Sequence, residues 1–453
     1  MEYIIPRVVL AGTNSGCGKT TVTCAILQAL VNRKLKVGAF KCGPDYIDPM
    51  FHSRVIGVKS SNLDLFFFQE NTLKYLLAKN GSGRDISVIE GVMGFYDGMS
   101  LTTTTASTYE ISQVTQSPVV LVVAAKGASL SILATIQGFL NFCPDHQICG
   151  VILNQCTATT YSVLEKEIQT RFTGKVQPLG FLPVMPECSL ESRHPGLITA
   201  AEVQVLREKL QNLSVQAEET INLDGLLALA TTSSSISCEA IKLPRQQEPV
   251  RIAVARDNAF CFYYEDSLDA LREMGAELVP FSPLSDQELP PDIQGLYLGG
   301  GYPELHAERL SENNAMRTSV KTALEQGIPC IAECGGFMYL TESISEFPMV
   351  GFLPGKSFDA GKLIRFGYVH LKANHDNMLC KSGEEISGHE FHYWDSENHG
   401  SSFTSSKASG KSWKCVHATQ QLYAGYPCFH FYSNPGFAVN FYNACLKERY
   451  RHD

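Results

Sequence analysis

The stretch that decides the fold of the first half of the chain is VVLAGTNSGCGKTT, residues 8–21. It opens with a short apolar run, continues through a glycine-rich segment, and leads into a helical pattern over residues 20–32. A strand, a glycine-rich turn and a helix in this order are the context of a phosphate-binding loop. Backbone N–H groups in such a loop converge on phosphate oxygens, and the helix N-terminus adds favourable partial charge. We therefore predict an ATP site at this turn.

The loop is a variant of the usual pattern. Five residues lie between Gly12 and Gly18, so the four-residue frame begins at Thr13. Lys19 is expected to pair with the β and γ phosphates, and the Thr20 hydroxyl is expected to ligate Mg²⁺. A glycine-rich turn without a ligand is the alternative. The predicted cofactor-binding residues are Thr13, Asn14, Gly16, Gly18, Lys19, Thr20 and Thr21.

Apolar runs of strand length recur along the chain and indicate an α/β fold. In the first half they occupy residues 8–11, 37–40, 86–89, 119–124 and 150–153. Near-continuous apolar strands that alternate with helices predict a parallel sheet covered on both faces. A Thr/Ser run followed by Lys, Pro, Arg, Gln and Glu marks a linker, and a second strand series then occupies residues 251–255, 295–298, 329–332 and 426–431. We predict domains at 1–231 and 250–453, joined by a linker at 232–249.

Two acidic segments follow predicted strands of the first domain. The segment KCGPDYIDP, residues 41–49, contains Asp45 and Asp48, and EGVMGFYDG, residues 90–98, contains Glu90 and Asp97. Carboxylates at the carboxyl ends of parallel strands lie where α/β proteins bind ligands. They can coordinate Mg²⁺ or orient a substrate carboxylate through the metal. Turn chemistry is the alternative, because Asp and Pro are common turn residues.

A candidate nucleophile lies in the second domain. The segment PCIAECGG, residues 329–336, predicts a strand and a sharp turn into a helix, with Cys334 at the helix N-terminus. That position stabilises a thiolate, and flanking glycines permit a nucleophile elbow. The preceding glycine triplet, residues 299–301, could supply oxyanion-hole N–H groups, which we assign to Gly300 and Gly301. An ATP site and a thiol nucleophile in one chain predict ATP-driven amidation with glutamine as nitrogen donor.

The long motifs together resemble the cobyrinic acid a,c-diamide synthase family, whose members amidate tetrapyrroles. The resemblance continues through residues 251–260, 298–306, 333–336, 365–368 and 388–393, and covers nearly the whole chain. It implies a phosphate-loop parallel-sheet domain followed by a class I-like glutamine amidotransferase α/β domain. In such enzymes ATP phosphorylates a propionate side chain, ammonia from glutamine displaces the phosphate, and the a and c side chains are amidated in turn. By this resemblance Asp45, Tyr46, Asp48 and Asp97 would bind substrate, and Thr20 and Glu90 would hold Mg²⁺.

The base that serves the thiol departs from the family pattern. Members often carry Tyr-x-His-x-His-Phe near the C-terminus, whereas this chain has YPCFHF at residues 426–431, so Cys428 takes the place of the first histidine. A thiol nucleophile needs a base. We assign this role to His430, the histidine that remains in this segment, with His389 and His392 as alternatives. If the family base is the first histidine, the thiol is poorly activated and the enzyme depends on free ammonia.

Composition narrows the class of protein further. The net charge of −9, from 37 Lys and Arg against 46 Asp and Glu, argues against a broad nucleic-acid surface. Fifteen scattered cysteines without a Cys-x-x-Cys pair, and no secretory signal, favour reduced thiols in the cytoplasm. The most apolar stretch, residues 118–140, is interrupted by Lys126, Gly127 and serines, so we expect no membrane span.

Several substrates and one other class of protein stay open. The expected partners are small molecules, glutamine and a tetrapyrrole polycarboxylate, and the motifs do not separate cobyrinic acid from nickel sirohydrochlorin or hydrogenobyrinic acid. A non-catalytic nucleotide-switch protein with a degenerate amidotransferase domain is the rival from another class. Partition-type switch ATPases place a second lysine where this chain has Asn14, and the intact elbow at Cys334 also argues against that rival. Oligomeric state is not visible in the sequence.

Overall fold

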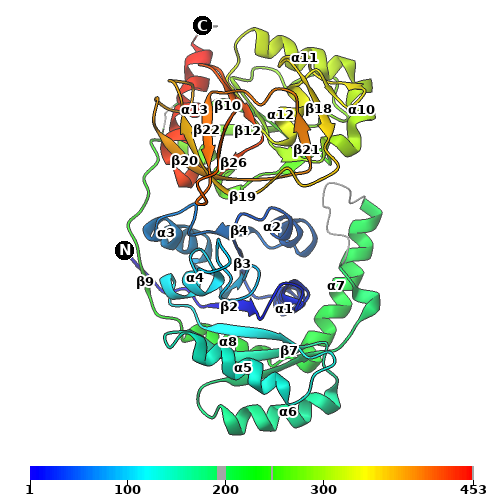
Figure 1. Ribbon diagram of the computed structural model, residues 1–453, viewed down its shortest axis with the longest axis vertical. Coiled ribbons are helices and arrows are strands. Elements are labelled where there is room, and N and C mark those ends of the chain that lie inside the picture. The colour runs from blue at the N-terminus through cyan, green and yellow to red at the C-terminus, as the bar shows by residue number, and fades with distance from the viewer. Residues whose placement is uncertain (191–199, 246–247, 451–453) are drawn as a thin grey trace. The chain divides into compact units, whose positions relative to one another are not determined.

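Two compact units make up the described chain, which comprises residues 1–190, 200–245 and 248–450 of the computed structural model. The first unit ends at Ile241 and the second begins at Lys242 (Figure 1). Both units are built on a mainly parallel sheet with helices between the strands.

The described part of the first unit is centred on a seven-stranded sheet with the order β4-β3-β5-β2-β6-β7-β8. All neighbouring strands in it pair in parallel. Its strands are β2 (Arg7–Gly12), β3 (Val37–Cys42), β4 (Ser60–Leu63), β5 (Ile86–Glu90), β6 (Val119–Ala124), β7 (Ile148–Asn154) and β8 (Gln177–Leu182). Its helices are α1 (Lys19–Asn32), α2 (Ile47–Phe51), α3 (Glu70–Gly81), α4 (Thr108–Val114), α5 (Ser131–Phe142), α6 (Ala158–Arg171), α7 (Ala200–Thr220) and α8 (Leu223–Thr231).

Strand order explains why the phosphate loop meets the acidic segments. The strands β3, β5 and β2 are neighbours, so their carboxyl ends share one edge of the sheet. The loop follows β2, while KCGPDYIDP begins within β3 and Glu90 ends β5. Each of the five strands predicted for this half falls within an observed strand. β4 and β8 escaped prediction because polar residues in one, and Pro and Gly in the other, interrupt the apolar pattern.

The second unit contains a six-stranded sheet with the order β12-β10-β13-β15-β25-β24 within the described residues. Pairing is parallel except between β25 and β24. Its strands are β10 (Val250–Ala255), β12 (Ala276–Phe281), β13 (Gly295–Leu298), β15 (Cys330–Glu333), β24 (His417–Ala418) and β25 (Leu422–Gly425). The helices of this unit are α9 (Glu265–Met274), α10 (Ala307–Glu312), α11 (Asn314–Glu325), α12 (Gly335–Leu340) and α13 (Pro435–Arg449).

Smaller sheets accompany the central sheet of the second unit. One is a five-stranded antiparallel sheet with the order β23-β22-β19-β20-β26, and another is a four-stranded sheet with the order β17-β16-β18-β21. The first contains β19 (Arg365–Ala373), β20 (Glu385–His392), β22 (Phe403–Ser406), β23 (Ser412–Cys415) and β26 (Cys428–Phe429). The second contains β16 (Ser343–Ile344), β17 (Phe347–Pro348), β18 (Lys356–Asp359) and β21 (Trp394–Ser396), while β11 (Phe260–Phe262) pairs separately with β14 (Gly300–Gly301).

One sequence expectation needs correction. The single strand predicted over residues 426–431 is wrong: the central sheet uses β25, and the chain leaves it before Pro427, which has no N–H for a ladder. β26 then pairs with β20 in the other sheet. The linker at residues 232–249 stays a prediction. Within it, β9 (Ile236–Ser237) pairs antiparallel with β1 (Glu2–Tyr3), and this strand belongs to the first unit.

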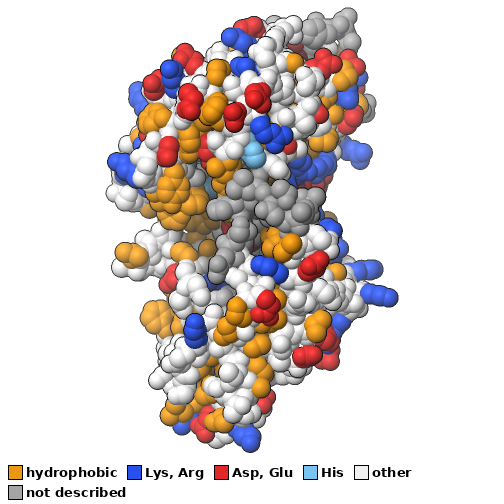
Figure 2. All heavy atoms as spheres, turned by 90° about the vertical axis from the view of Figure 1, so that its right-hand side faces the viewer, with side chains coloured by type: hydrophobic (Ala, Val, Ile, Leu, Met, Phe, Trp, Pro, Cys, Tyr) orange, Lys and Arg blue, Asp and Glu red, His pale blue; other side chains and the backbone are white. Residues whose placement is uncertain are grey.

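The surface carries both apolar and charged side chains. Figure 2 shows hydrophobic side chains gathered on one side of the second unit, and acidic and basic side chains scattered over both units. Exposed aromatic residues of the second unit include Phe366, Phe391 and Tyr393 on or just after β19 and β20. Across the three described ranges, no helix is long and apolar enough to cross a membrane.

Candidate functional site

The phosphate loop has a backbone that only glycine accommodates at one key position. Gly18 has φ 90°, in the left-handed region, and caps α1. A Cβ at this position would collide with the side-chain nitrogen of Asn154, at the end of β7. That same nitrogen donates a hydrogen bond of 2.9 Å to the carbonyl oxygen of Cys17. Asn154 therefore holds the loop in place, a role that the sequence analysis did not assign.

Two side chains of the loop face the end of β5. Lys19 Nζ donates to the carbonyl oxygen of Met93, and Thr20 Oγ1 donates to Glu90 Oε1 over 2.7 Å. Burial lowers the pKa of Lys19, although the carboxylates of Glu90 and Asp48 act in the opposite direction. Of the other predicted loop residues, Thr13 and Thr21 are half-buried, whereas Asn14 and Gly16 are exposed.

A buried cluster of charges lies beneath this loop. Lys41 Nζ is 2.6 Å from Asp48 Oδ2 and 3.0 Å from Glu90 Oε1. His52 Nε2 is 3.3 Å from Glu90 Oε2. Burial and Asp48 oppose ionisation of Glu90, but Lys41 and His52 outweigh them and lower its pKa. Burial likewise opposes the charge of Lys41, yet the carboxylates raise its pKa.

The cluster unites residues that lie far apart in the sequence. Glu90 is a carboxylate that contacts the Lys41 ammonium, the His52 ring and the Thr20 hydroxyl. Carboxylate and hydroxyl oxygens are ligands that Mg²⁺ prefers. Lys41 and His52 were missed by the sequence analysis. Lys41 carried a signal, since a lysine inside an otherwise apolar strand needs a buried partner. His52 carried none, because its partner comes from a distant strand.

The remaining acidic residues occupy different environments. Asp45 Oδ1 accepts a hydrogen bond of 2.8 Å from the N–H of Ile47, and burial together with Asp48 raises the pKa of Asp45 to about 6. Tyr46 is buried beside it. Asp97 is exposed and accepts a hydrogen bond of 2.7 Å from the N–H of Gly94, so it orders its own loop. The structure thus brings Asp45 and Asp48 into the Lys41 cluster and places Asp97 on the turn that follows Glu90.

The thiol of the second unit sits on a strained turn. Cys334 lies between β15 and α12 with φ 49° and ψ −106°, a conformation that few residues with a side chain adopt. A Cβ on Gly336 would collide with the carbonyl oxygen of Leu298, so the helix can start this close to β13 only with glycine there. The Cys334 N–H donates to the carbonyl oxygen of Gly425 over 2.8 Å. The half-buried thiol therefore lies on the sharp strand-to-helix turn that the motif predicts, and its role as a nucleophile stays a prediction.

The predicted oxyanion glycines lie beside the thiol. A Cβ added to Gly300 would stand 3.6 Å from the Cβ of Cys334. Gly301 has φ 156°, and a Cβ there would collide with the carbonyl oxygen of Ala259. Both glycines form β14, which pairs with β11. Their backbone can therefore approach a ligand of Cys334 closely.

The buried carboxyl group of Glu333, directly before Cys334, forms two hydrogen bonds that stabilise the turn. Glu333 Oε1 accepts from the N–H of Phe429 over 2.9 Å, and Oε2 accepts from the Tyr297 hydroxyl over 2.7 Å. Burial raises the pKa of Glu333 to about 7, although both hydrogen bonds act to lower it. Glu333 ties the segment that carries Cys428 and His430 to the elbow. Its sequence signal was an acidic residue at the end of an apolar strand.

The candidate bases form a linked group of aromatic rings. The fully buried His430 accepts from the Tyr432 N–H at Nδ1 over 3.1 Å, and its ring centroid lies 4.8 Å from that of Tyr264. The Tyr264 hydroxyl is 3.3 Å from Nδ1 of His389, whose pKa burial lowers to about 4. His389 lies opposite Cys428 in the β20–β26 pair. Which imidazole serves Cys334 stays a prediction.

Each of the two units matches a known family of protein domains. Residues 8–195 match the CobQ/CobB/MinD/ParA nucleotide binding domain, and residues 251–435 match the CobB/CobQ-like glutamine amidotransferase domain. A protein from Clostridium acetobutylicum named cobyrinate a,c-diamide synthase is 41% identical over 436 residues, 95% of this chain and 98% of that protein. The chain belongs to the cobyrinate a,c-diamide synthase family. Proteins of the same name from Caldanaerobacter subterraneus and Listeria innocua are 40% and 39% identical, and they align with 96% and 97% of this chain and 98% and 99% of their own.

Membership of the cobyrinate a,c-diamide synthase family confirms several expectations drawn from the motifs. The fold class is confirmed, since a phosphate-loop parallel-sheet domain precedes a glutamine amidotransferase α/β domain. The expected enzyme class, a glutamine-dependent amidating ligase, is confirmed as well. Among solved structures, PurLQS from Thermotoga maritima aligns with 44% of this chain and 98% of its own length, at a TM-score of 0.33 and 16% sequence identity.

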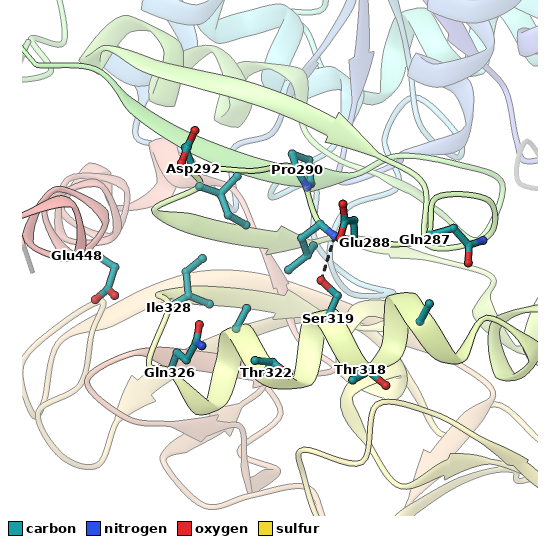
Figure 3. Close-up of a pocket in the computed structure, with 14 residues that line it drawn as sticks. Gln287, Glu288, Pro290, Asp292, Thr318, Ser319, Thr322, Gln326, Ile328 and Glu448 are labelled. Carbon is teal, nitrogen blue, oxygen red and sulfur yellow. Dashed lines mark hydrogen bonds between the residues drawn. The ribbon is translucent and has the colours of Figure 1, made fainter. Parts of the chain in front are cut away.

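A large cavity in the second unit lies away from the Cys334 thiol. It has a volume of about 550 Å³ and lies between α11 and the segment before β13 (Figure 3). The labelled Asp292 and Ile328 precede β13 and β15, whereas Cys334 follows the opposite end of β15. One wall is closed by the hydrogen bond of 3.1 Å from the Leu289 N–H to Ser319 Oγ. This cavity therefore has no part in the elbow chemistry.

Proposed function

We propose that this chain catalyses the ATP- and glutamine-dependent amidation of the a and c carboxylates of cobyrinic acid, through acyl-phosphate intermediates. The observation that carries the proposal is the presence in one chain of two ordered sites, the phosphate loop with Thr20 on Glu90 and the elbow at Cys334. The names of the near full-length relatives support the choice of substrate.

The residues of the first site fit ATP with Mg²⁺. Mg²⁺ prefers oxygen ligands and is usually held by one or two protein groups together with phosphates and water. The Thr20 hydroxyl and the Glu90 carboxylate, 2.7 Å apart, are such a pair. Within the described residues no group of three or more His, Cys, Asp and Glu side chains forms a metal cage, which suits a metal that arrives with its nucleotide. When bound, Mg²⁺ would offset the negative charge of the phosphates.

The side chains of the first unit would position and activate one carboxylate of the substrate. A bond forms between a carboxylate oxygen and the γ-phosphorus, and the bond from that phosphorus to the β–γ bridging oxygen breaks, so ADP leaves. Lys19 would stabilise the charge that develops on the phosphates. Lys41 helps to lower the pKa of Glu90. Asp45, Tyr46, Asp48 and Asp97 would hold the substrate. Ammonia then attacks the acyl carbon, the carbon–oxygen bond to phosphate breaks, and the nitrogen loses a proton.

The second unit would release that ammonia. The Cys334 thiolate attacks the side-chain amide carbon of glutamine, and the N–H groups of Gly300 and Gly301 would stabilise the oxyanion. His430, the proposed base, takes the thiol proton and returns it to the departing amide nitrogen. Water then hydrolyses the thioester and gives glutamate.

Two variants test the proposal. Cys334→Ser is expected to abolish amidation with glutamine and to retain amidation with ammonia, whereas Lys19→Ala should remove both. Each protein is incubated with MgATP, a nitrogen source and cobyrinic acid, nickel sirohydrochlorin or hydrogenobyrinic acid, and products are measured by mass. Amidation of another macrocycle in preference to cobyrinic acid would overturn the substrate assignment. Absence of ATP-dependent amidation with every macrocycle would favour the nucleotide-switch alternative.

A further inference from the structure

His52 belongs to the buried cluster beneath the phosphate loop, but the proposed reaction uses only its neighbours. It begins η1 (His52–Ile56), a π-helix that continues directly from α2, and its side chain is completely buried. Asp48, four residues earlier on α2, lies on the same face, and its Oδ2 is 2.6 Å from Lys41 Nζ. The segment from α2 into η1 therefore brings two side chains to the charged groups around Glu90.

Each ring nitrogen of His52 lies beside a particular polar group. Nδ1 is 3.2 Å from the hydroxyl oxygen of Ser60, the first residue of β4. Nε2 is 3.3 Å from Oε2 of Glu90, the last residue of β5. Both Nε2 and Oε2 are buried, and in the described part of the chain neither atom has a hydrogen bond to any other group. Because buried polar atoms need a partner, each of these two atoms depends on the other.

The chemistry of these groups fixes one of the ring hydrogens. Glu90 lies 3.0 Å from the Lys41 ammonium, which favours the carboxylate form, and a carboxylate only accepts hydrogen bonds. Nε2 of His52 therefore carries the hydrogen on the side of Glu90. In a neutral ring Nδ1 is then an acceptor, and the Ser60 hydroxyl is a suitable donor to it.

The two oxygens of Glu90 have different neighbours. Oε1 accepts from the Thr20 hydroxyl over 2.7 Å and also lies beside Lys41. Oε2 lies beside His52 on the other side of the carboxylate. A contact at Oε2 restricts rotation of the carboxylate about its last carbon–carbon bond, and so it also restricts the direction of Oε1. Partners of this kind orient the ligands of metal sites in proteins.

We propose that His52 is a positioning residue for Mg²⁺: it holds Oε2 of Glu90 and thereby keeps Oε1 beside the Thr20 hydroxyl. The inference rests on the proposed function, in which these two oxygens hold the metal that accompanies ATP. Ser60 in turn holds the ring of His52, so the contacts run from β4 through η1 and β5 to the phosphate loop. Residues that orient a metal ligand typically contribute about 10- to 100-fold to metal affinity.

Manganese binding to the full-length protein tests this role, because Mn²⁺ substitutes for Mg²⁺ and its protein-bound form is observed by electron paramagnetic resonance. Each variant is titrated with Mn²⁺ in the presence of β,γ-methylene-ATP, which cannot transfer its γ-phosphate by hydrolysis of a bridging oxygen. His52→Leu and His52→Asn are expected to weaken Mn²⁺ binding about 10- to 100-fold. His52→Gln should stay near wild type, because the amide nitrogen of glutamine reaches about as far as Nε2, whereas that of asparagine reaches only as far as Nδ1.

The matched control is His146→Leu. His146 accepts a hydrogen bond from the N–H of Ile148 at the start of β7, whereas the contact with the phosphate loop is made by Asn154 at the other end of that strand. This variant should bind Mn²⁺ like the wild type. Binding of the ATP analogue in EDTA separates orientation of a metal ligand from a general loss of structure, and His52→Leu should match the wild type there.

Several outcomes would overturn the role of His52. Wild-type Mn²⁺ affinity in His52→Leu is one, and an equal loss in His52→Gln and His52→Asn is another. A matching loss of analogue binding in EDTA would show a merely structural role. If His52→Leu does not fold, as judged by circular dichroism, the comparison of glutamine with asparagine decides. Glu90→Gln examines the proposed function separately, because wild-type Mn²⁺ affinity in that variant would remove the metal site itself.

Discussion

Replacing Cys334 by glycine is expected to stabilise the second unit even though it removes the proposed nucleophile. The residue has φ 49° and ψ −106°, and a residue with a Cβ held in such a conformation costs about 1–3 kcal/mol. Glycine adopts it without that cost but loses about 0.5–1 kcal/mol relative to alanine, because its unfolded chain is more flexible. The glycine variant should therefore exceed Cys334→Ala in unfolding free energy by about 1 kcal/mol.

The alanine variant is the matched control, since it also lacks the thiol but keeps the Cβ. Urea unfolding followed by tryptophan fluorescence is the assay, because the two tryptophans of the chain, Trp394 and Trp413, both lie in the second unit. The signal therefore reports this unit alone. A glycine variant that is equal to or less stable than the alanine variant would refute the idea that the elbow stores backbone strain.

Three further predictions concern the charged and basic residues. Glu90→Gln should cut amidation steeply with either nitrogen source while glutamate release persists, because the defect lies in carboxylate activation; wild-type amidation would return Glu90 to a structural role. His430→Ala should lower glutamine-dependent turnover about 10²–10⁴-fold and spare ammonia-dependent turnover; a large gain of glutamine use in Cys428→His would instead place the lost base at 428. Asp45→Asn should raise the calorimetric unfolding temperature of the first unit at pH 8 and leave it unchanged below pH 4. Burial raises the pKa of Asp45 from its unfolded-state value of 3.8 to about 6, so the wild-type protein loses stability as the pH rises through this interval. An equal change in unfolding temperature at pH 8 and below pH 4 would contradict this explanation.

Both turns that we propose to carry the chemistry could be predicted because their constraints are local. The glycine of the phosphate loop at Gly18 and the elbow at Cys334 are read from short segments in which a strand meets a helix. A backbone that must turn sharply within a few residues favours glycine at or beside the turn, as at Gly18 and next to Cys334, whatever the rest of the chain does. The spacing of such segments therefore predicts where each turn lies.

The side chains that tune these sites could not be predicted, because they meet through strand order. Lys41 and His52 reach Glu90 only since β3 lies next to β5, and no short segment contains all three. The strand assumed over residues 426–431 failed for a related reason: only β26, Cys428–Phe429, is strand there, and Pro427 separates it from β25, which belongs to the other sheet.

The pairing of β1 with β9 has a consequence for how the first unit could be handled as a module. Glu2 lies opposite Ser237, so the chain enters and leaves this unit at the same place. Joining these two points by a short connection would neither stretch the sheet nor cross it, and new ends could be opened in a surface loop elsewhere. Because its two ends lie close together, the first unit is suited to circular permutation and to insertion into another protein.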